Sequence, residues 1–230
     1  MHNPWLDLQP IGDRLVHLDD AAYVDAFNEV VGPEHRLVTS AWPQPWAGPI
    51  NTARVLILAA NPGWSADDEH AERQLAPLLE ENLTGDRPMF WLDPAAAGSP
   101  GSRWVRSRLL RSVLAELPDD AAENVVAGSV CLVEFHPYHA TKWKPIPITL
   151  PSQQHTFSLV RARIADGATV IVTRARREWT VAVPELLRCD QLFATRSVQN
   201  VHLSARNLGP NGWEALMGRL HAVHRSYFGG

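Results

Sequence analysis

Four short aliphatic runs of this chain each end in residues whose side chains can do chemistry. The groups that follow the runs are ANPGW at 60–64, EFHPYH at 134–139, TR at 173–174 and HLSARN at 202–207. Amide, carboxyl, imidazole and hydroxyl groups of this kind orient water, transfer protons and bind phosphate. Because ligands bind beyond the carboxyl ends of parallel strands, we expect the four groups to surround one site.

The elements that must position these groups alternate between strand and helix. Aliphatic runs without a polar face predict buried strands at 55–59, 130–135, 168–173 and 198–203. Spacing and caps predict helices at 19–31, 65–82, 102–117, 152–165, 174–187 and 213–224. This alternation is typical of the α/β class, and we expect a three-layer α/β/α fold with a central, mainly parallel four-stranded sheet. We treat residues 1–230 as a single domain in which residues 1–50 form an N-terminal extension packed on the core.

Composition is that of an ordinary globular protein and excludes several classes of site. The 230 residues are 45% hydrophobic, carry a net charge of −4 and include two cysteines, Cys131 and Cys189. Two distant cysteines predict reduced thiols and exclude a four-cysteine metal or iron–sulfur site. Neither a membrane-spanning run nor a secretory signal is present, so the expected location is cytoplasmic. Dinucleotide, Walker A, zinc-protease and serine-hydrolase motifs are absent, and we expect no metal and no cofactor.

Two of the four groups together resemble the signature motifs of a known enzyme superfamily. ANPG after the first run and HLSARN in the last resemble G-[IQ]-[ND]-P-[GY] and [HN]-P-S-x-L of the uracil-DNA glycosylase superfamily. The resemblance extends from Arg54 to the C-terminus. It implies a monofunctional enzyme that hydrolyses the N-glycosidic bond of a base flipped out of DNA. Ala59 stands in place of the family's glycine and Leu203 in place of its proline, as in a divergent member.

The resemblance also implies roles for individual residues. Asn61 matches the residue that holds the hydrolytic water, and His202 matches the histidine that stabilises negative charge on the departing base. The backbone N–H groups of Ala60 and Asn61 would face a base carbonyl, and Ser204 would hold a DNA phosphate. Arg206 occupies the position of the family's wedge leucine, which leaves a wedge role open, and Asn207 beside it is a further expected DNA contact.

Glu134 and several aromatic residues are the expected contacts of the base itself. Trp64, Phe135, Tyr138 and Trp143 offer aromatic faces, although each could instead pack in the core. Glu134 lies three residues before Pro137, where relatives carry an asparagine that reads uracil. A carboxylate accepts hydrogen bonds and suits the amino group of a modified cytosine, with uracil as the rival substrate. An ion pair of Glu134 with Arg54 or Arg174 is the structural alternative.

Basic residues are concentrated between positions 136 and 177, where seven cations accompany one anion. The candidate DNA contacts among them are Lys142, Lys144, Arg174 and Arg176, and ordinary solvated surface charge is the alternative. The expected partner is therefore DNA, single-stranded or duplex, that contains uracil or a modified pyrimidine, bound by a monomer. A defence role against phage genomes with modified bases is an extension of the Glu134 argument. A non-catalytic nucleic-acid- or nucleotide-binding module on the same fold and an unrelated α/β hydrolase or transferase remain the alternatives.

Overall fold

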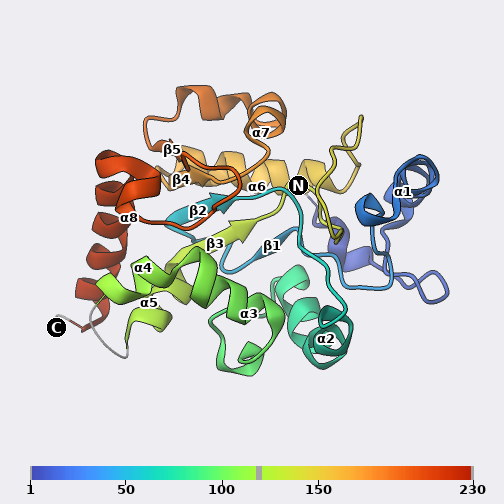
Figure 1. Cartoon of the computed structure of the whole chain (residues 1–230), viewed down its shortest axis with the longest axis horizontal. Helices are drawn as coiled ribbons and strands as arrows, with labels where there is room; N and C mark the ends of the chain where they lie inside the picture. The colour runs from blue at the N-terminus through green and yellow to red at the C-terminus, as the bar shows by residue number, and fades with distance from the viewer. Residues whose placement is uncertain (1, 118–120, 229–230) are drawn as a thin grey trace.

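The computed structural model describes residues 2–117 and 121–228 and has a mostly parallel sheet at its centre (Figure 1). Within these residues the sheet has five strands in the order β1-β3-β2-β4-β5. Its strands are β1 Trp46–Ala47, β2 Val55–Leu58, β3 Val130–Val133, β4 Thr169–Val172 and β5 Leu192–Ala194. Only β1 runs antiparallel to its neighbour. The mainly parallel α/β architecture is therefore confirmed.

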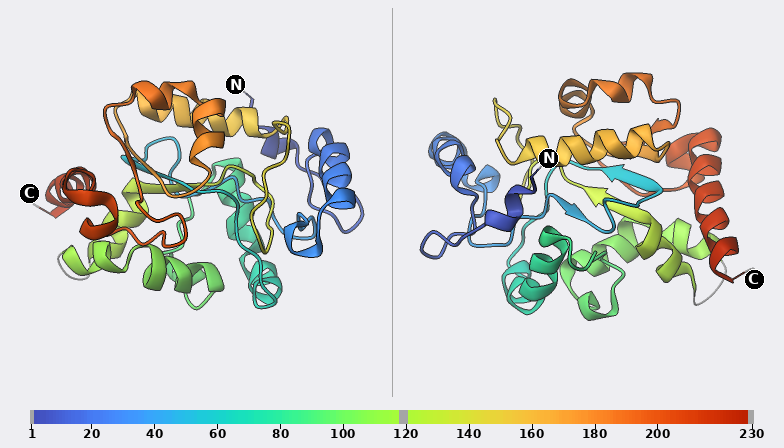
Figure 2. Two further views of the ribbon diagram at one scale, coloured as in Figure 1. Left: turned by 45° about the horizontal axis from the view of Figure 1, so that its top comes forward. Right: turned by 180° about the vertical axis from the view of Figure 1, so that it is seen from behind.

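Helices cover both faces of the sheet and form the two outer layers. In Figures 1 and 2, α6 and α7 lie on one side of the strands, and α3, α4 and α5 lie on the other. The helices are α1 Leu18–Val30, α2 Asp68–Thr84, α3 Pro100–Trp104, α4 Arg111–Glu116, α5 Ala122–Ser129, α6 Gln153–Ala165, α7 Arg176–Ala182 and α8 Ala205–Phe228.

Side chains of one strand alternate between the two layers. Leu56 and Leu58 of β2 pack in a core that includes Phe157 of α6 and Trp179 of α7. Val55 and Ile57 face the opposite core, which α4, α5 and α8 complete. Strands buried on both faces explain why β2, β3 and β4 are uninterrupted aliphatic runs.

Two strands differ from the sequence prediction. Strand β1 lies in the Pro- and Trp-rich connector at 40–50, so the sheet has five strands and not four. Residues 198–203 form no strand, and β5 at Leu192–Ala194 takes the predicted fourth position. Leu203 instead donates its N–H to the carbonyl of Leu109, outside the sheet. The residues of β5 are only partly buried, so their sequence lacks the aliphatic pattern of a central strand.

Three helical segments also differ from the prediction. The expected helix at 102–117 is divided by a π-helical turn, Val105–Leu109, between α3 and α4. The short helix α5, Ala122–Ser129, was not predicted. The last helix begins at Ala205 and contains a kink at Gly209, whose φ of 75° lies in the left-handed region that favours glycine.

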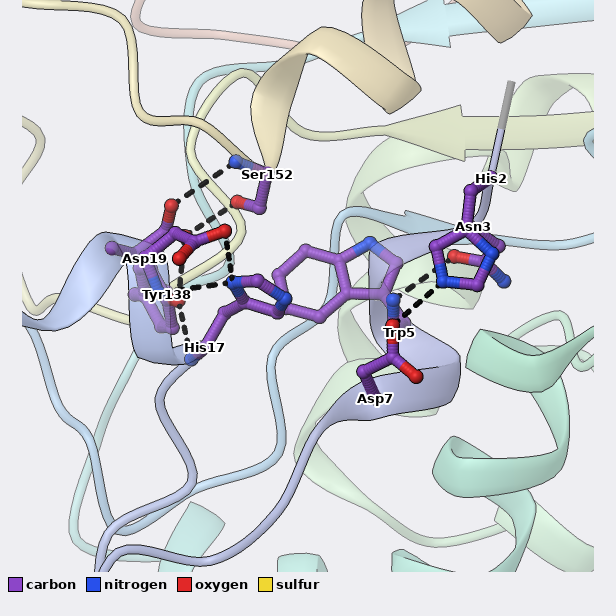
Figure 3. A network of polar contacts seen from close by, with 9 residues as sticks. His2, Asn3, Trp5, Asp7, His17, Asp19, Tyr138 and Ser152 are labelled. Carbon is purple, nitrogen blue, oxygen red and sulfur yellow. Dashed lines mark hydrogen bonds and ion pairs between the residues drawn. The ribbon is translucent and has the colours of Figure 1, made fainter.

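A network of polar contacts joins the N-terminal segment to the rest of the protein, and Figure 3 shows His17, Tyr138 and Ser152 in it. Asp20 of α1 accepts hydrogen bonds from the Tyr138 hydroxyl at 2.7 Å and from the backbone N and Oγ of Ser152 at 3.0 and 2.5 Å. The backbone N–H of His17 donates to the same tyrosine oxygen at 3.1 Å. Trp5 belongs to the hydrophobic cluster that contains β2 and β3 side chains. These contacts join the start of α1 and Trp5 to the segments that follow β3.

No helix of the described residues is long and apolar enough to cross a membrane.

Candidate functional site

A cavity of about 450 Å³ lies at the carboxyl ends of β2, β3 and β4. Five of the predicted site residues line it, namely Ala60, Asn61, Trp64, Glu134 and Arg174. They come from the segments after three neighbouring strands, which is the expected place for a ligand in an open α/β sheet. Its volume falls within the range of about 300–1,000 Å³ that is usual for small-ligand pockets.

The turn that carries Asn61 is held from both sides. The carbonyl of Leu58 accepts hydrogen bonds from the backbone N–H and the hydroxyl of Thr173, at 2.8 and 2.9 Å. The N–H of His136 donates to the carbonyl of Ala60 at 2.9 Å, and the N–H of Ala140 donates to the carbonyl of Pro62 at 3.2 Å. These contacts fix the path of the chain from β2 into the cavity wall.

The Asn61 carboxamide has one free side. Its Nδ2 donates to the carbonyl of Pro62 at 2.8 Å and to that of Ala140 at 3.2 Å, which uses both amide hydrogens. Its Oδ1 has no hydrogen-bond partner in the described part of the chain, and neither have the backbone N–H groups of Ala60 and Asn61. The turn therefore presents an acceptor and two donors to a ligand.

Glu134 is a buried carboxyl group on the same cavity. The residue is only 7% exposed, and its Oε2 has no hydrogen-bond partner. Burial raises the pKa of Glu134 to about 8, although the positive charge of Arg174 acts in the opposite direction. Neither Arg54 nor Arg174 forms an ion pair with Glu134 within 4 Å among the described residues, so the direct ion-pair alternative is wrong. An unsatisfied buried oxygen on a cavity wall is a ready contact for a ligand.

Glu72 also lines the cavity and was not predicted as a site residue, whereas His139 was expected there only as a member of the group at 134–139. Glu72 Oε1 lies 3.4 Å from His139 Nε2, and burial raises the pKa of Glu72 to about 8. His139 Nδ1 lies 2.7 Å from the carbonyl oxygen of Gly63. A sequence signal for Glu72 did exist, because it shares the helical spacing of the buried Leu75 and Leu79 on α2.

Aromatic side chains form much of the remaining wall. The tryptophans that line the cavity are Trp64, Trp91, Trp104 and Trp143. Trp64 makes an edge contact with the His139 ring, with ring centroids 5.2 Å apart. Flat apolar walls of this kind suit a planar heterocycle.

Phe135 and Tyr138 do not line the cavity, so their predicted base contact is wrong. Phe135 is 7% exposed and packs against Phe157 and Trp179 in the core. Tyr138 is fully buried, and its hydroxyl is engaged with Asp20. Both residues pack in the core, which was the alternative to base contact.

The second motif lines a separate cavity of about 620 Å³. Its predicted residues are His202, Ser204, Arg206 and Asn207, and the unpredicted ones are Arg196, Ser197 and Asn200. His202 Nε2 lies 3.0 Å from the hydroxyl oxygen of Ser112, and burial together with Arg111 lowers the pKa of His202. Because Val201 lines the first cavity, the two cavities adjoin at 201–202. The expectation of one common site is therefore corrected to two neighbouring cavities.

Asn207 holds the loop before α8 rather than presenting its side chain to DNA. It is 7% exposed, its Nδ2 donates to the carbonyls of Asn200 and His202, and its Oδ1 accepts from the N–H of Ser197. The prediction of Asn207 as a DNA contact is wrong because its amide hydrogens are used inside the protein.

The predicted basic contacts are exposed to solvent. Lys142, Lys144, Arg174 and Arg176 all lie on the surface, and only Arg174 lines the first cavity. Lys142 Nζ lies 3.9 Å from Glu34 Oε1, which partly offsets its charge. In the described residues, no group of three or more His, Cys, Asp or Glu side chains could hold a metal ion.

Comparisons with protein-family models, with curated proteins and with solved structures find no match to this chain. Function has to be inferred from the geometry of the two cavities.

Proposed function

We propose that this protein is a monofunctional DNA glycosylase that hydrolyses the N-glycosidic bond of a flipped pyrimidine and leaves an abasic site. The observation that carries this proposal is the Asn61 carboxamide. Its two amide hydrogens are tied to the carbonyls of Pro62 and Ala140, so its free Oδ1 can accept a hydrogen bond from water. This acceptor lies on a cavity of suitable size, walled by tryptophans.

The chemistry of bond cleavage fits these groups. As the bond breaks, positive charge develops on the sugar and negative charge on the base, and fixed dipoles aimed at both lower the barrier. A water held by Asn61 Oδ1 would attack the sugar C1′. An amide is a weak base, but a cationic sugar needs little activation of the water. The free N–H groups of Ala60 and Asn61 would receive a carbonyl of the base.

His202 has the second catalytic role in this proposal, the stabilisation of negative charge on the departing base. Its ring contacts Ser112 in the free protein and lines the adjoining cavity. The role therefore requires DNA binding to turn the ring toward the first cavity. Catalytic hydrogen bonds often form only in the substrate complex.

Glu134 is the proposed reader of the base edge. A carboxyl group whose pKa is about 8 is mainly protonated at neutral pH, so it offers an O–H donor beside a carbonyl acceptor. With cytosine, the O–H would donate to N3 and the carbonyl oxygen would accept from the N4 amino group. With uracil, the O–H would donate to O4 and the carbonyl oxygen would accept from N3–H. Protonation thus removes the simple preference of a carboxylate for cytosine. The cavity of about 450 Å³ has room for a pyrimidine that carries a substituent.

Base release from defined DNA tests the activity and the substrate together. Duplexes and single strands that carry uracil, cytosine, 5-hydroxymethylcytosine or a bulkier derivative are incubated with the enzyme, and abasic sites are cleaved with alkali. We expect release of a substituted cytosine. Release of uracil alone would contradict the proposal that the substrate is a modified cytosine. Release of no base from any substrate would contradict the proposal that the protein is a DNA glycosylase.

DNA phosphates are the proposed ligands of the second cavity. Ser204, Arg206 and Arg196 line this cavity, and the two arginine side chains supply positive charge for a phosphate. The exposed cations Arg174, Arg176, Lys142 and Lys144 would extend this contact along the strand. In this proposal Arg206 fills the gap left by the base, and the protein acts as a cytoplasmic monomer.

One observation favours a second candidate function, a nucleic-acid-binding module without catalysis. His202 and Asn61 line different cavities, and the His202 ring is engaged with Ser112. Such a module would bind the same DNA panel and release no base from any member of it.

A further inference from the structure

Helix α3 begins with a glycine that has no room for a side chain. Gly101 follows Pro100 in the first turn of the helix. A Cβ atom at Gly101 would lie 2.6, 2.7 and 2.9 Å from Cε3, Cζ3 and Cδ2 of Trp91, closer than real Cβ atoms approach other heavy atoms. The backbone does not require glycine, because the φ of Gly101 lies outside the left-handed region and alanine is the better helix former. The neighbouring ring therefore explains why this residue is glycine.

The contact involves the face of the Trp91 ring. Three adjacent ring atoms lie at nearly equal distances from the Cβ position, whereas an approach at the ring edge would place one atom clearly nearer than its neighbours. The benzene part of the indole thus packs with a face toward the α-carbon of Gly101. Both residues line the first cavity, so this close packing is part of the cavity wall.

One arginine fixes the distance between the two segments that carry Trp91 and Gly101. Arg106 Nη2 donates to the carbonyl of Leu92 at 3.2 Å, and its Nε donates to the hydroxyl oxygen of Ser102 at 3.2 Å. Leu92 and Ser102 directly follow the two residues in contact. The backbone therefore cannot separate here without breaking these hydrogen bonds, and a side chain at position 101 would have to displace the ring.

The surroundings of Trp91 determine where a displaced ring would go. Trp91 packs against the hydrophobic cluster that contains Val55 and Ile57 of β2, and against a second cluster that contains Leu75 and Leu79 of α2. Protein interiors are close-packed and leave no space for a ring to enter. The cavity is open space beside the ring, so the ring would move toward the cavity and narrow it.

We infer that Gly101 is a specificity-determining residue, because the missing side chain keeps Trp91 against α3 and leaves room in the cavity for a substituent on the pyrimidine ring. This inference rests on the proposed function and names the wall that the substituent contacts. An indole face suits such a planar or apolar group. Asn61 and Glu134 follow strands of the sheet, so a change in α3 alters the room beside the base and leaves both of these groups in place.

Fluorine NMR of the full-length protein labelled with 5-fluorotryptophan tests the packing without any substrate. Trp91→Phe identifies the Trp91 resonance by its loss. We expect Gly101→Ala to shift this resonance, because the ring has to move. Gly218→Ala on α8 is the matched control, since a Cβ there has no heavy atom within 4 Å, and it should leave the resonance unchanged. A Trp91 resonance that is the same in Gly101→Ala and in the wild type would overturn the inference.

Base release from the DNA panel tests the specificity role. Gly101→Ala is expected to slow release of a bulky 5-hydroxymethylcytosine derivative about 10- to 100-fold more than release of the smallest base that the enzyme accepts. Adding Trp91→Phe should recover most of this loss, because the smaller ring leaves space for the methyl group, whereas a merely destabilised protein would not recover. Gly218→Ala should match the wild type on each base. Equal losses for all substrates, or no recovery in the double variant, would overturn the specificity role. If the fluorine resonance shifts as expected and the wild type releases no base, the packing stands and the glycosylase fails.

Discussion

At the scale of single residues, the site is defined by which hydrogen-bonding atoms already have a partner in the protein and which do not. Asn61 is informative because both of its amide hydrogens have partners and its oxygen has none. Glu134 is informative for the opposite reason, because its buried Oε2 has no partner in the protein. Both residues were predicted from sequence, because each lies near the carboxyl end of a buried aliphatic run.

The buried acids should make folding stability depend on pH. The folded pKa of Glu134 is about 8, above its ordinary value of 4.5, so its contribution to stability is complete below pH 4.5 and is lost as pH rises through 8. Glu134→Gln has no proton to lose. The free energy of unfolding, from urea titrations at pH 5, 7 and 9, should therefore fall less in this variant than in the wild type. Glu80→Gln, on the exposed side of α2, is the control. If the free energy of unfolding of Glu134→Gln fell with pH as much as that of the wild type, the raised pKa of Glu134 would be contradicted.

At the scale of elements, the central strands were predictable and their edges were not. β2, β3 and β4 are buried on both faces and consist of aliphatic residues, which a sequence reveals directly. The two-residue β1 and the partly buried β5 lack that pattern, because edge strands need fewer apolar residues. Leu203 was misleading, since its burial arises from contact with the helical layer and not from the sheet.

The Asp20 carboxylate of helix α1 is hydrogen-bonded to Tyr138 and Ser152, which gives a second prediction. Asp20→Asn cannot accept all three hydrogen bonds from Tyr138 and Ser152, and it should lower the free energy of unfolding by about 1–3 kcal/mol in urea titrations. Asp19→Asn, whose side chain is 68% exposed, should change it by less than about 0.5 kcal/mol. Equal effects of the two substitutions would show that the Asp20 network does not fasten the N-terminal segment.

At the scale of the whole molecule, the two motifs adjoin but line different cavities. The sequence predicted the first cavity from Asn61, Glu134 and Arg174, because all three follow parallel strands. It missed Glu72 and Arg196, whose positions depend on how α2 and the loop before α8 pack against the core. Tyr138 could not be assigned to the core from its neighbours, because its partner Asp20 is 118 residues away.

The second cavity should control DNA affinity through charge. Replacing Arg196 and Arg206 together by alanine should weaken duplex binding about tenfold at low salt. The slope of log affinity against log salt should fall by about 2 in the same variant. Fluorescence anisotropy from 50 to 300 mM salt measures both quantities. Arg188→Ala, an exposed arginine outside both cavities, is the control, and an unchanged slope in the double variant would exclude phosphate contacts there.

The most direct test of the account is single-turnover base release by Asn61→Ala, compared with Asn51→Ala, an exposed asparagine in the turn before β2. With the best substrate of the panel, we expect wild type and Asn51→Ala to form abasic sites at the same rate. Asn61→Ala should be slower by about 100-fold or more, with DNA affinity within about twofold of wild type. Undiminished base release by Asn61→Ala would contradict the assignment of Asn61 as the residue that holds the attacking water.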